Sequence, residues 1–370
     1  MRFRCDRGTL VDRLAVLARA VSARSALPVL SGILLQASEE RLNLYATDME
    51  ISVRATLTST IDEPGDVVVP ARLFSDIVRN LSGDEVTVES GGGGTVQVVA
   101  GKAVFELNSW AASDFPQTSA FDLSASFRVA ADPLVETLSK VARAASRDET
   151  RPILTGVLVV LGGGSLKMVA TDSYRLAVKQ SQLEGGPETE MQAIVPVKAL
   201  GEVARLAAAG DRDAVDVAVT ENQAVFGFGE VVLATRLIDG AFPNYKQLLP
   251  DAYEHELELE KESFLAVARR VGLLAQKNAP LRLRFSAGSL TMRAITQDVG
   301  QAEEQIDVTY EGEDFEIGFN HAYLIDGVEA VEGSKISLKL ISPLRPGLIT
   351  GVDEAAADFV YLIMPIRLST

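Results

Sequence analysis

The chain is poor in the residues that most metal sites and covalent catalysts need. Its 370 residues include one cysteine, Cys5, and two histidines, His255 and His321. A single cysteine cannot form an internal disulfide and fits a reducing compartment such as the cytoplasm. Because the histidines do not form a His-x-x-x-His pattern, the sequence argues against a metal site and leaves few bases for a nucleophile–histidine–acid triad. We therefore expect no metal and no cofactor.

Long apolar runs and an excess of basic residues are also missing. No apolar run reaches the length of about 18–20 residues that crosses a membrane, and the N-terminal segment lacks the apolar core of a secretion signal. The formal net charge of −16 argues against a general nucleic-acid binder, although a local basic face can coexist with an acidic exterior. With 47% hydrophobic residues, the chain can fill two or three ordinary cores. We expect a cytoplasmic protein without a membrane partner.

Two patterns that could suggest catalysis have simpler interpretations. The glycine run at Gly91–Gly94 lacks the following Gly-Lys-Ser/Thr of a phosphate loop, so it predicts a hairpin turn. Asp48 and Asp172 could be paired catalytic carboxylates. We favour a turn in which each carboxylate accepts hydrogen bonds from backbone N–H groups. An enzyme using either aspartate is our least favoured function.

The main feature that is present is an internal repeat. Ala46-Thr47-Asp48 recurs as Ala170-Thr171-Asp172, and similar segments precede both, "LPVLSGILLQASEERLNLY" and "RPILTGVLVVLGGGSLKMV". A weaker third copy, "APLRLRFSAGSLTMRAITQDVG", spans Ala279–Gly300. Each copy contains a proline near its start, followed by a pattern of strand, turn and strand. Three β-hairpins are therefore predicted.

A helical pattern precedes each hairpin. Apolar residues recur at spacings 0, 4, 7 and 11 from Leu10, Leu134 and Phe264, which is one face of an α-helix. The predicted N-caps of these three helices are Thr9, Asp132 and Ser263.

A second half follows in each copy, with a short strand entering another helix. The segments are "VVVPARLFSDIVRNL", "AIVPVKALGEVARL" and "EIGFNHAYLIDGVEAV". Three units of roughly 120 residues then account for the chain, and we predict α+β domains at residues 1–121, 127–250 and 251–370. Each needs helices on one face of its sheet. Closing such units into a ring would remove their exposed sheet edges.

The three-copy plan, together with "ATDSYRLAV", "DGAFPNYKQLLP" and "IMPIRL", resembles the bacterial DNA polymerase III β subunit family, the sliding clamps. The resemblance covers residues 1–368. It implies three tandem clamp domains in a head-to-tail homodimeric ring, with helices lining the channel and sheets outside. It also implies a processivity clamp, with no catalytic site of its own, that encircles and slides on double-stranded DNA independently of sequence during replication and repair. The implied protein partners are the polymerase III α subunit, the clamp loader, other polymerases and repair proteins, bound through short linear peptides.

The resemblance also implies where DNA would lie. Basic residues occur on the predicted helices and their exit loops, and such side chains attract phosphates without reading sequence. The third copy's second helix is an exception, since it has almost no basic residue. The first helices of copies two and three also carry Arg143, Arg269 and Arg270. The residues ranked first for DNA proximity are Arg24, Arg72, Arg79, Arg147, Arg151, Lys198 and Lys277.

Two further surfaces follow from the resemblance. The dimer contact is expected at Phe105 and Leu107 on one side and at Leu273 and Leu274 on the other; ordinary core packing is the alternative for these four. An apolar peptide groove is expected between the second and third copies. Its predicted residues are Leu154, Thr171, Ser173, Tyr174, Arg175, Leu176, Pro243, Gln247, Leu248, Leu344, Pro346, Leu362, Met364, Pro365, Ile366, Arg367 and Leu368.

Some positions depart from the pattern of many relatives. Ser173-Tyr174 and Gln247 replace Gly-His and Arg, and Ser369-Thr370 extend the usual end. These changes bear on which peptide is preferred. A ring-shaped scaffold that no longer encircles DNA is the alternative function.

Overall fold

The computed structural model describes residues 1–22, 27–91, 93–116, 121–183, 186–187, 189–209, 213–250, 252–275, 279–353 and 358–368. Arg24 and Lys277 lie outside these residues. The chain forms two compact units: unit 1 contains residues 1–129 and 209–237, and unit 2 contains residues 130–208 and 238–370. In the described part of the chain, no helix combines the length and apolarity needed to cross a membrane.

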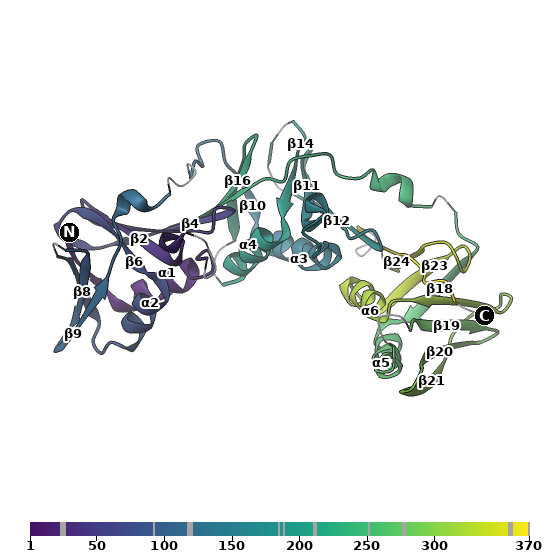
Figure 1. Cartoon of the computed structure of the whole chain (residues 1–370). Coiled ribbons are helices and arrows are strands. Elements are labelled where there is room, and N and C mark those ends of the chain that lie inside the picture. Colours follow the sequence, from purple (N-terminus) through teal and green to yellow (C-terminus); the bar gives the residue numbers. More distant parts are fainter. Residues whose placement is uncertain are drawn as a thin grey trace. The chain divides into compact units, whose positions relative to one another are not determined.

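Two helices belong to each copy of the repeat (Figure 1). The α-helices are α1 (Arg7–Leu17), α2 (Ala71–Asn80), α3 (Ala131–Val141), α4 (Val197–Ala209), α5 (Lys261–Gly272) and α6 (His321–Ala330). The short 3-10 helices are η1 (Pro28–Ser31), η2 (Ala112–Asp114), η3 (Ala142–Ala144), η4 (Pro152–Thr155) and η5 (Tyr245–Leu248).

Unit 1 contains two sheets. Their strand orders are β5-β1-β7-β8-β9 and β10-β15-β16-β17-β4-β3-β2-β6. The strands are β1 (Arg2–Asp6), β2 (Gly32–Ser38), β3 (Arg41–Thr47), β4 (Ile51–Thr58), β5 (Thr60–Glu63), β6 (Gly65–Pro70), β7 (Glu85–Ser90), β8 (Thr95–Ala100), β9 (Ala103–Asn108), β10 (Phe127–Ala130), β15 (Ala214–Val219), β16 (Gln223–Phe228) and β17 (Val231–Arg236).

Unit 2 also contains two sheets. Their orders are β14-β11-β12-β13-β25-β24-β23-β18 and β21-β20-β19-β22. The strands are β11 (Gly156–Gly162), β12 (Ser165–Thr171), β13 (Arg175–Gln182), β14 (Met191–Pro196), β18 (His255–Glu260), β19 (Leu281–Ser286), β20 (Ser289–Thr296), β21 (Gly300–Asp307), β22 (Phe315–Phe319), β23 (Lys335–Leu340), β24 (Gly347–Gly351) and β25 (Phe359–Ile363).

The three predicted hairpins are present as β2–β3, β11–β12 and β19–β20. Their turns are closed by equivalent pairs: Ser38↔Arg41, Gly162↔Ser165 and Ser286↔Ser289. The prediction of a repeat is therefore confirmed at the level of strand register. These turn pairs also define which positions correspond between the copies.

Neighbouring copies are joined by strand pairing. In unit 1, β17 of the second copy pairs antiparallel with β4 of the first. In unit 2, β25 of the third copy pairs antiparallel with β13 of the second. Each eight-stranded sheet thus contains strands from two copies. For this reason the predicted middle domain, 127–250, contributes β10 and β15–β17 to the unit 1 sheet and β11–β14 to unit 2.

The first three positions of each predicted pattern lie in the helices, but the fourth lies beyond each helix end, and the predicted starts are wrong by two or three residues. Leu10, Leu14 and Leu17 are buried along α1, and the corresponding residues of α3 and α5 are buried as well. Each helix begins directly after a strand, so Thr9, Asp132 and Ser263 lie inside the first turn instead of capping it. In α1 the cap is Asp6, whose carboxylate accepts from the backbone N–H of Thr9 at 2.6 Å.

Candidate functional site

The repeated Thr-Asp motif forms the same turn in both copies. The Oδ1 atom of Asp172 accepts from the backbone N–H groups of Tyr174 at 2.9 Å and Arg175 at 3.0 Å. Asp48 makes the equivalent bonds to Glu50 and Ile51. The turn interpretation is therefore confirmed. A carboxylate held this way shapes the backbone and places the next residue, with φ 79° at Ser173, in a strained left-handed conformation.

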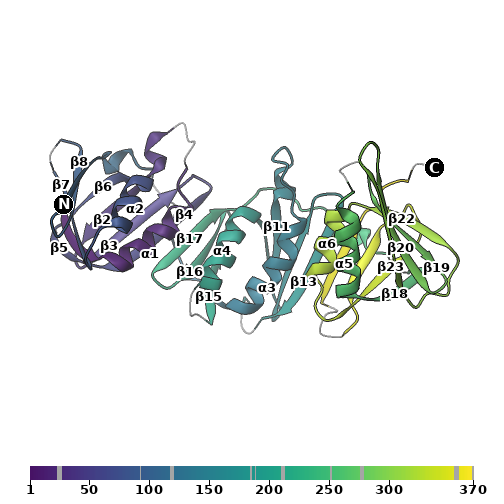
Figure 2. The same cartoon turned by 90° about the horizontal axis from the view of Figure 1, so that it is seen from below.

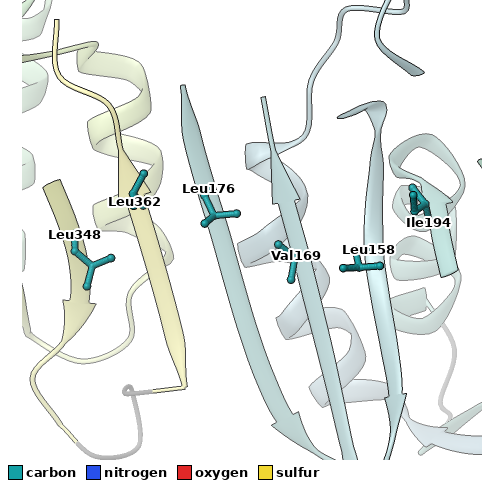
Figure 3. Packing of buried hydrophobic residues seen from close by; sticks show 6 residues of the cluster. All are labelled: Leu158, Val169, Leu176, Ile194, Leu348 and Leu362. Atoms are coloured by element: carbon teal, nitrogen blue, oxygen red, sulfur yellow. The ribbon is translucent and has the colours of Figure 1, made fainter. Parts of the chain in front are cut away.

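An apolar cluster lies across the β13–β25 pairing in unit 2. We call it the junction cluster, and Figure 3 shows its side chains in a row across neighbouring strands. Its buried members are Leu158, Val169, Leu176, Ile194, Leu348 and Leu362. The row continues from the second copy into the third because β13 pairs with β25, with Leu176 opposite Leu362.

The junction cluster and the helices occupy opposite faces of this sheet. On β13, Leu176 and Val178 belong to the cluster, whereas Lys179 reaches Glu136 of α3 at 2.8 Å. On β25, Leu362 faces the cluster while the hydroxyl of Tyr361 donates to the carbonyl of Tyr323 in α6 at 2.9 Å. Successive side chains of a strand point to opposite faces. One sheet therefore presents an apolar face and a helix-covered face, and Figure 2 shows α3 and α6 packed on it.

All predicted peptide-binding residues lie in unit 2, and their exposure separates them into three groups. The buried ones are Leu154, Thr171, Leu176 and Leu362. The half-buried ones are Arg175, Pro346, Pro365, Ile366 and Leu368. The exposed ones are Ser173, Tyr174, Pro243, Gln247, Leu248, Leu344, Met364 and Arg367. The exposed group contains four large apolar side chains that water does not favour: Tyr174 at 60%, Leu248 at 49%, Leu344 at 59% and Met364 at 40%.

Backbone hydrogen bonds hold the C-terminal segment beside the Ser173 turn. The N–H of Met364 donates to the carbonyl of Tyr174 at 2.8 Å, and the N–H of Ile366 donates to that of Gly318 at 2.7 Å. Gly318 has no side chain to obstruct this approach: a Cβ there would lie 2.5 Å from Cδ2 of Leu368. Tyr174 and Met364 are therefore neighbours beside the junction cluster.

Arg175 has a structural role in the described unit. Its guanidinium contacts Asp172 at 3.1 Å and Asp326 at 2.5 Å, and it stacks 4.1 Å from the ring centre of Tyr323. The side chain is only 10% exposed. It therefore ties the second copy to α6 of the third. By contrast, Arg151 is accessible and links Asp148 to the hydroxyl of Ser173 at 3.1 Å.

Sequence reasoning missed three aromatic side chains and one leucine at the junction cluster. Phe242, Tyr245, Leu249 and Tyr253 pack partly buried against it. Burial raises the pKa of Tyr245, with a smaller contribution from Glu190. The available signal was the recurrence of large apolar residues in "AFPNYKQLLPDAY" at spacings of three, four and four. The prediction selected only Pro243, Gln247 and Leu248 from this segment.

The five described residues of the predicted DNA set are all exposed: Arg72 and Arg79 on α2, Lys198 on α4, and Arg147 and Arg151 after η3. Arg24 and Lys277 are not among the described residues. Two other basic residues, Arg143 and Arg269, make close ion pairs with Glu329 of α6. Sequence reasoning did not identify this acidic partner.

The predicted dimer residues fall into two environments. Phe105 on the edge strand β9 is 42% exposed, and Leu273 after α5 is 83% exposed. Leu274 is half-buried. Leu107 is 4% exposed and packs into the core of unit 1. Its side chain therefore fits the alternative of ordinary core packing.

Comparison with known proteins agrees with this architecture. Residues 1–119, 128–244 and 246–367 match family models described as the N-terminal, central and C-terminal domains of the DNA polymerase III beta subunit. The chain is 34% identical over 383 residues to a beta sliding clamp of Streptomyces coelicolor, covering 100% of both chains.

Solved structures show the same fold. The DNA polymerase sliding clamp of Bacillus subtilis superimposes with a TM-score of 0.94 at 30% identity, covering 100% of both chains. A sliding clamp of Pseudomonas aeruginosa bound to griselimycin gives 0.91 at 30% identity, again covering 100% of both. The chain belongs to the family of bacterial DNA polymerase III β subunits, the sliding clamps.

Proposed function

We propose that two copies of the chain close head to tail into a ring that encircles double-stranded DNA in the cytoplasm and slides on it independently of sequence. The ring tethers the polymerase III α subunit during replication and receives the clamp loader, other polymerases and repair proteins. As a β subunit, the chain is an accessory protein without a catalytic site of its own. Family membership supports the function, and the strand edges support the ring.

One observation carries the ring. The two pairings that join copies within the chain, β17 with β4 and β25 with β13, use equivalent strands. The next pair in this series would be β9 with β21, and both are edge strands in the described sheets. An exposed strand edge has unpaired backbone N–H and C=O groups and therefore tends to pair with another strand. A second copy of the chain supplies β21 to β9 and β9 to β21, which closes the ring with a two-fold axis.

Equivalence also predicts the register of this contact. Val231 pairs with Ala55 and Leu233 with Val53 across the unit 1 junction. The turn pairs place Ala103 at the position of Val231 and Glu304 at the position of Ala55. Ala103 should therefore lie opposite Glu304 of the partner subunit, and Phe105 opposite Ala302 of the partner subunit.

The register can be tested with cysteines. A chain carrying Phe105→Cys and Ala302→Cys should oxidise to a covalent dimer that is linked at both contacts, because directly opposed strand positions bring side chains together. The matched control carries Phe105→Cys and Gln305→Cys, three positions out of register. Equal crosslinking of both variants, or none in either, would contradict the proposed contact. The native Cys5 is buried.

Encirclement predicts topological retention. The crosslinked ring, closed after loading on nicked circular DNA, should stay bound at high salt and be released when the DNA is linearised, because it slides off the ends. It should also lengthen the products of the polymerase when loaded before synthesis. A stable ring with neither property would favour the scaffold.

We further propose that the exposed apolar residues beside the junction cluster bind linear peptides from the partners. Tyr174, Leu344 and Met364 supply apolar surface that a peptide would cover. Leu344→Glu should weaken binding of a fluorescent α-subunit tail peptide by at least about tenfold, since it places a charge in an apolar contact. Leu27→Glu, at a leucine of unit 1 that is 55% exposed, is the matched control. Equal affinity of both variants for the peptide would contradict this site.

A further inference from the structure

The second helix of each copy carries a charged residue at one equivalent position, and its sign changes in the third copy. The strand before this helix ends at Pro70 in copy one and at Pro196 in copy two, while Asn320 precedes α6. Counting from these residues aligns the buried Phe74, Leu200 and Leu324. The same alignment places Arg79, Arg205 and Glu329 at one position.

In copies one and two, this position presents a cation on its own helix. Arg79 lies 3.9 Å from Asp76, and Arg205 lies 2.8 Å from Glu202, each three residues earlier. Such pairs within one helix are weak. The Arg205 side chain is 32% exposed, with its Nη2 atom buried. The Arg79 side chain is 60% exposed.

In copy three, the acidic residue forms ion pairs with cations of other helices. Oε1 of Glu329 lies 2.7 Å from Nη2 of Arg269 on α5. Oε2 lies 2.8 Å from Nη1 of Arg143, which follows α3 in η3. The pKa of Glu329 is lowered chiefly by the hydrogen bond from Arg269 and then by that from Arg143. One carboxylate therefore neutralises basic residues of two copies.

The end of α6 that carries Glu329 is itself fixed. The ammonium of Lys261 donates to the backbone carbonyls of Glu329, at 3.2 Å, and of Val331. The carboxylate is thus positioned by its helix and does not depend on a flexible loop. Its side chain remains 32% exposed, and those of Arg143 and Arg269 are 37% and 56% exposed. Solvent, and any anion in it, can reach the two guanidinium groups.

A DNA phosphate and a carboxylate compete for the same donors, because guanidinium groups bind either with paired N–H···O hydrogen bonds. We infer that Glu329 is an internal competitor for DNA phosphates, which occupies Arg143 and Arg269 and thereby weakens the attraction of this helical face for the duplex. The inference rests on the proposed function, in which the helices face DNA. Glu329 of the third copy would thus keep the number of phosphate contacts low, so that the ring slides easily.

The test measures how DNA affinity depends on salt. Binding of the protein to a short linear duplex is measured by fluorescence anisotropy across a salt series. Glu329→Gln keeps the shape of the side chain but removes the negative charge that holds both arginines, so the slope of log Kobs against log salt should steepen by about 0.9 for each new phosphate contact. Glu329→Arg, which restores the residue of the other two copies, should steepen it further.

Two comparisons separate this role from a structural one. Glu258→Gln removes the same charge from an exposed position of β18, on a sheet, and should leave the slope unchanged. Arg143→Ala with Arg269→Ala should reduce DNA affinity several-fold more in the Glu329→Gln background than in the native background, because only freed arginines reach phosphate. A residue that merely joins helices would not produce this difference.

The results distinguish two failures. If the native protein is retained on circular DNA but Glu329→Gln and Glu258→Gln give the same slope, the competitor role is wrong and the proposed function stands. An equal loss of affinity from the arginine substitutions in both backgrounds would overturn it too, since the arginines would then bind phosphate despite Glu329. If the native ring is not retained on circular DNA, the proposed function itself fails.

Discussion

The two pairings between copies have the same backbone geometry, but two equivalent positions are apolar in one pairing and basic in the other. In the unit 1 pairing, Ile51 and Ala55 of β4 are buried at 2% and 0% exposure. The equivalent positions of β13 in unit 2 are Arg175 and Lys179. At these two positions, unit 1 therefore carries apolar side chains and unit 2 carries cations, although both junctions also contain apolar contacts. The backbone hydrogen bonds of the paired strands are compatible with either kind of side chain.

Both cations of the unit 2 junction, Arg175 and Lys179, contact acids. Lys179, 2% exposed, contacts Glu136 at 2.8 Å and Asp358 at 3.0 Å. Lys140 also contacts Glu136, at 2.7 Å, and reaches Glu332. Buried ion pairs often add little stability relative to apolar replacements, yet breaking one is costly. A strand without an acid such as Asp358 would leave Lys179 with Glu136 alone, so this second ion pair favours β25 as the partner of β13.

The first and largest effect should come from Arg175→Ala. It removes the contacts to Asp172 and Asp326 and the stacking on Tyr323, so unit 2 should lose about 3 kcal/mol. Hydrogen exchange of β25 peptides should report the loss. Trp110, the single tryptophan, lies in unit 1 and its unfolding signal should not move. Equal destabilisation of both units would break the contrast between the junctions.

Arg175→Ile, which copies the residue of unit 1, sharpens this test. Its apolar volume replaces part of the lost packing, and Asp326, 35% exposed, can turn to water. We expect a smaller loss than for Arg175→Ala. A larger loss would show that the charge itself, and not the filled volume, holds the junction.

A second effect, about 2 kcal/mol, is expected from Lys179→Ala, because Glu136 and Asp358 then lose a shared partner but remain partly exposed. Adding Glu136→Ala should recover part of the loss, since it removes one of the two carboxylates that lost their shared cation. Denaturant unfolding followed by exchange at β13 gives the coupling energy through the double-mutant cycle. Strictly additive losses would contradict a shared network.

A third effect concerns unit 1. Phe121 packs on the apolar cluster at β17 and lies 5.3 Å from the guanidinium of Arg54. Because its side chain is half-buried, Phe121→Ala should cost about 1 kcal/mol. The midpoint of the Trp110 fluorescence transition should fall, while exchange at β25 stays as in the native protein. A change at β25 of the same size would mean that the two junctions are not independent.

The sequence predicted what local periodicity and repetition determine. The buried residues of the helices, the three hairpins and the Asp172 turn depend on neighbours a few positions away. The helix starts were misplaced because each helix begins directly after a strand end. Ala130 and Glu260 provide no side-chain cap, and the cap of α1 is Asp6, the last residue of β1. The acids of the site were missed because they are distant along the chain: Arg175 and Asp326 are separated by 151 positions.

The same limit explains the basic residues. Arg143 and Arg269 look like phosphate ligands when only their own helices are considered. Their partner Glu329 was visible in the sequence, at the position of Arg79 and Arg205, but a reversed sign there identifies no contact. Only the structure, in which Glu329 reaches Arg269 of α5 and Arg143 of η3, shows which cations it contacts. Repeat alignment can therefore mark an exceptional position, and geometry is needed to give it a role.

The smallest effect separates the junctions by pH. Burial alone would raise the pKa of Glu136, but hydrogen bonds from Lys140 and Lys179 outweigh it and lower the pKa from 4.5 to about 2. A carboxyl with a depressed folded-state pKa stabilises above its unfolded pKa, and this contribution is lost as pH falls toward the folded value. Unit 2 should therefore weaken between pH 4.5 and 2, by a modest amount because the side chain is 42% exposed. In Glu136→Gln, exchange at β13 should lack that component, whereas an unchanged acid profile would show that other carboxylates govern the junction.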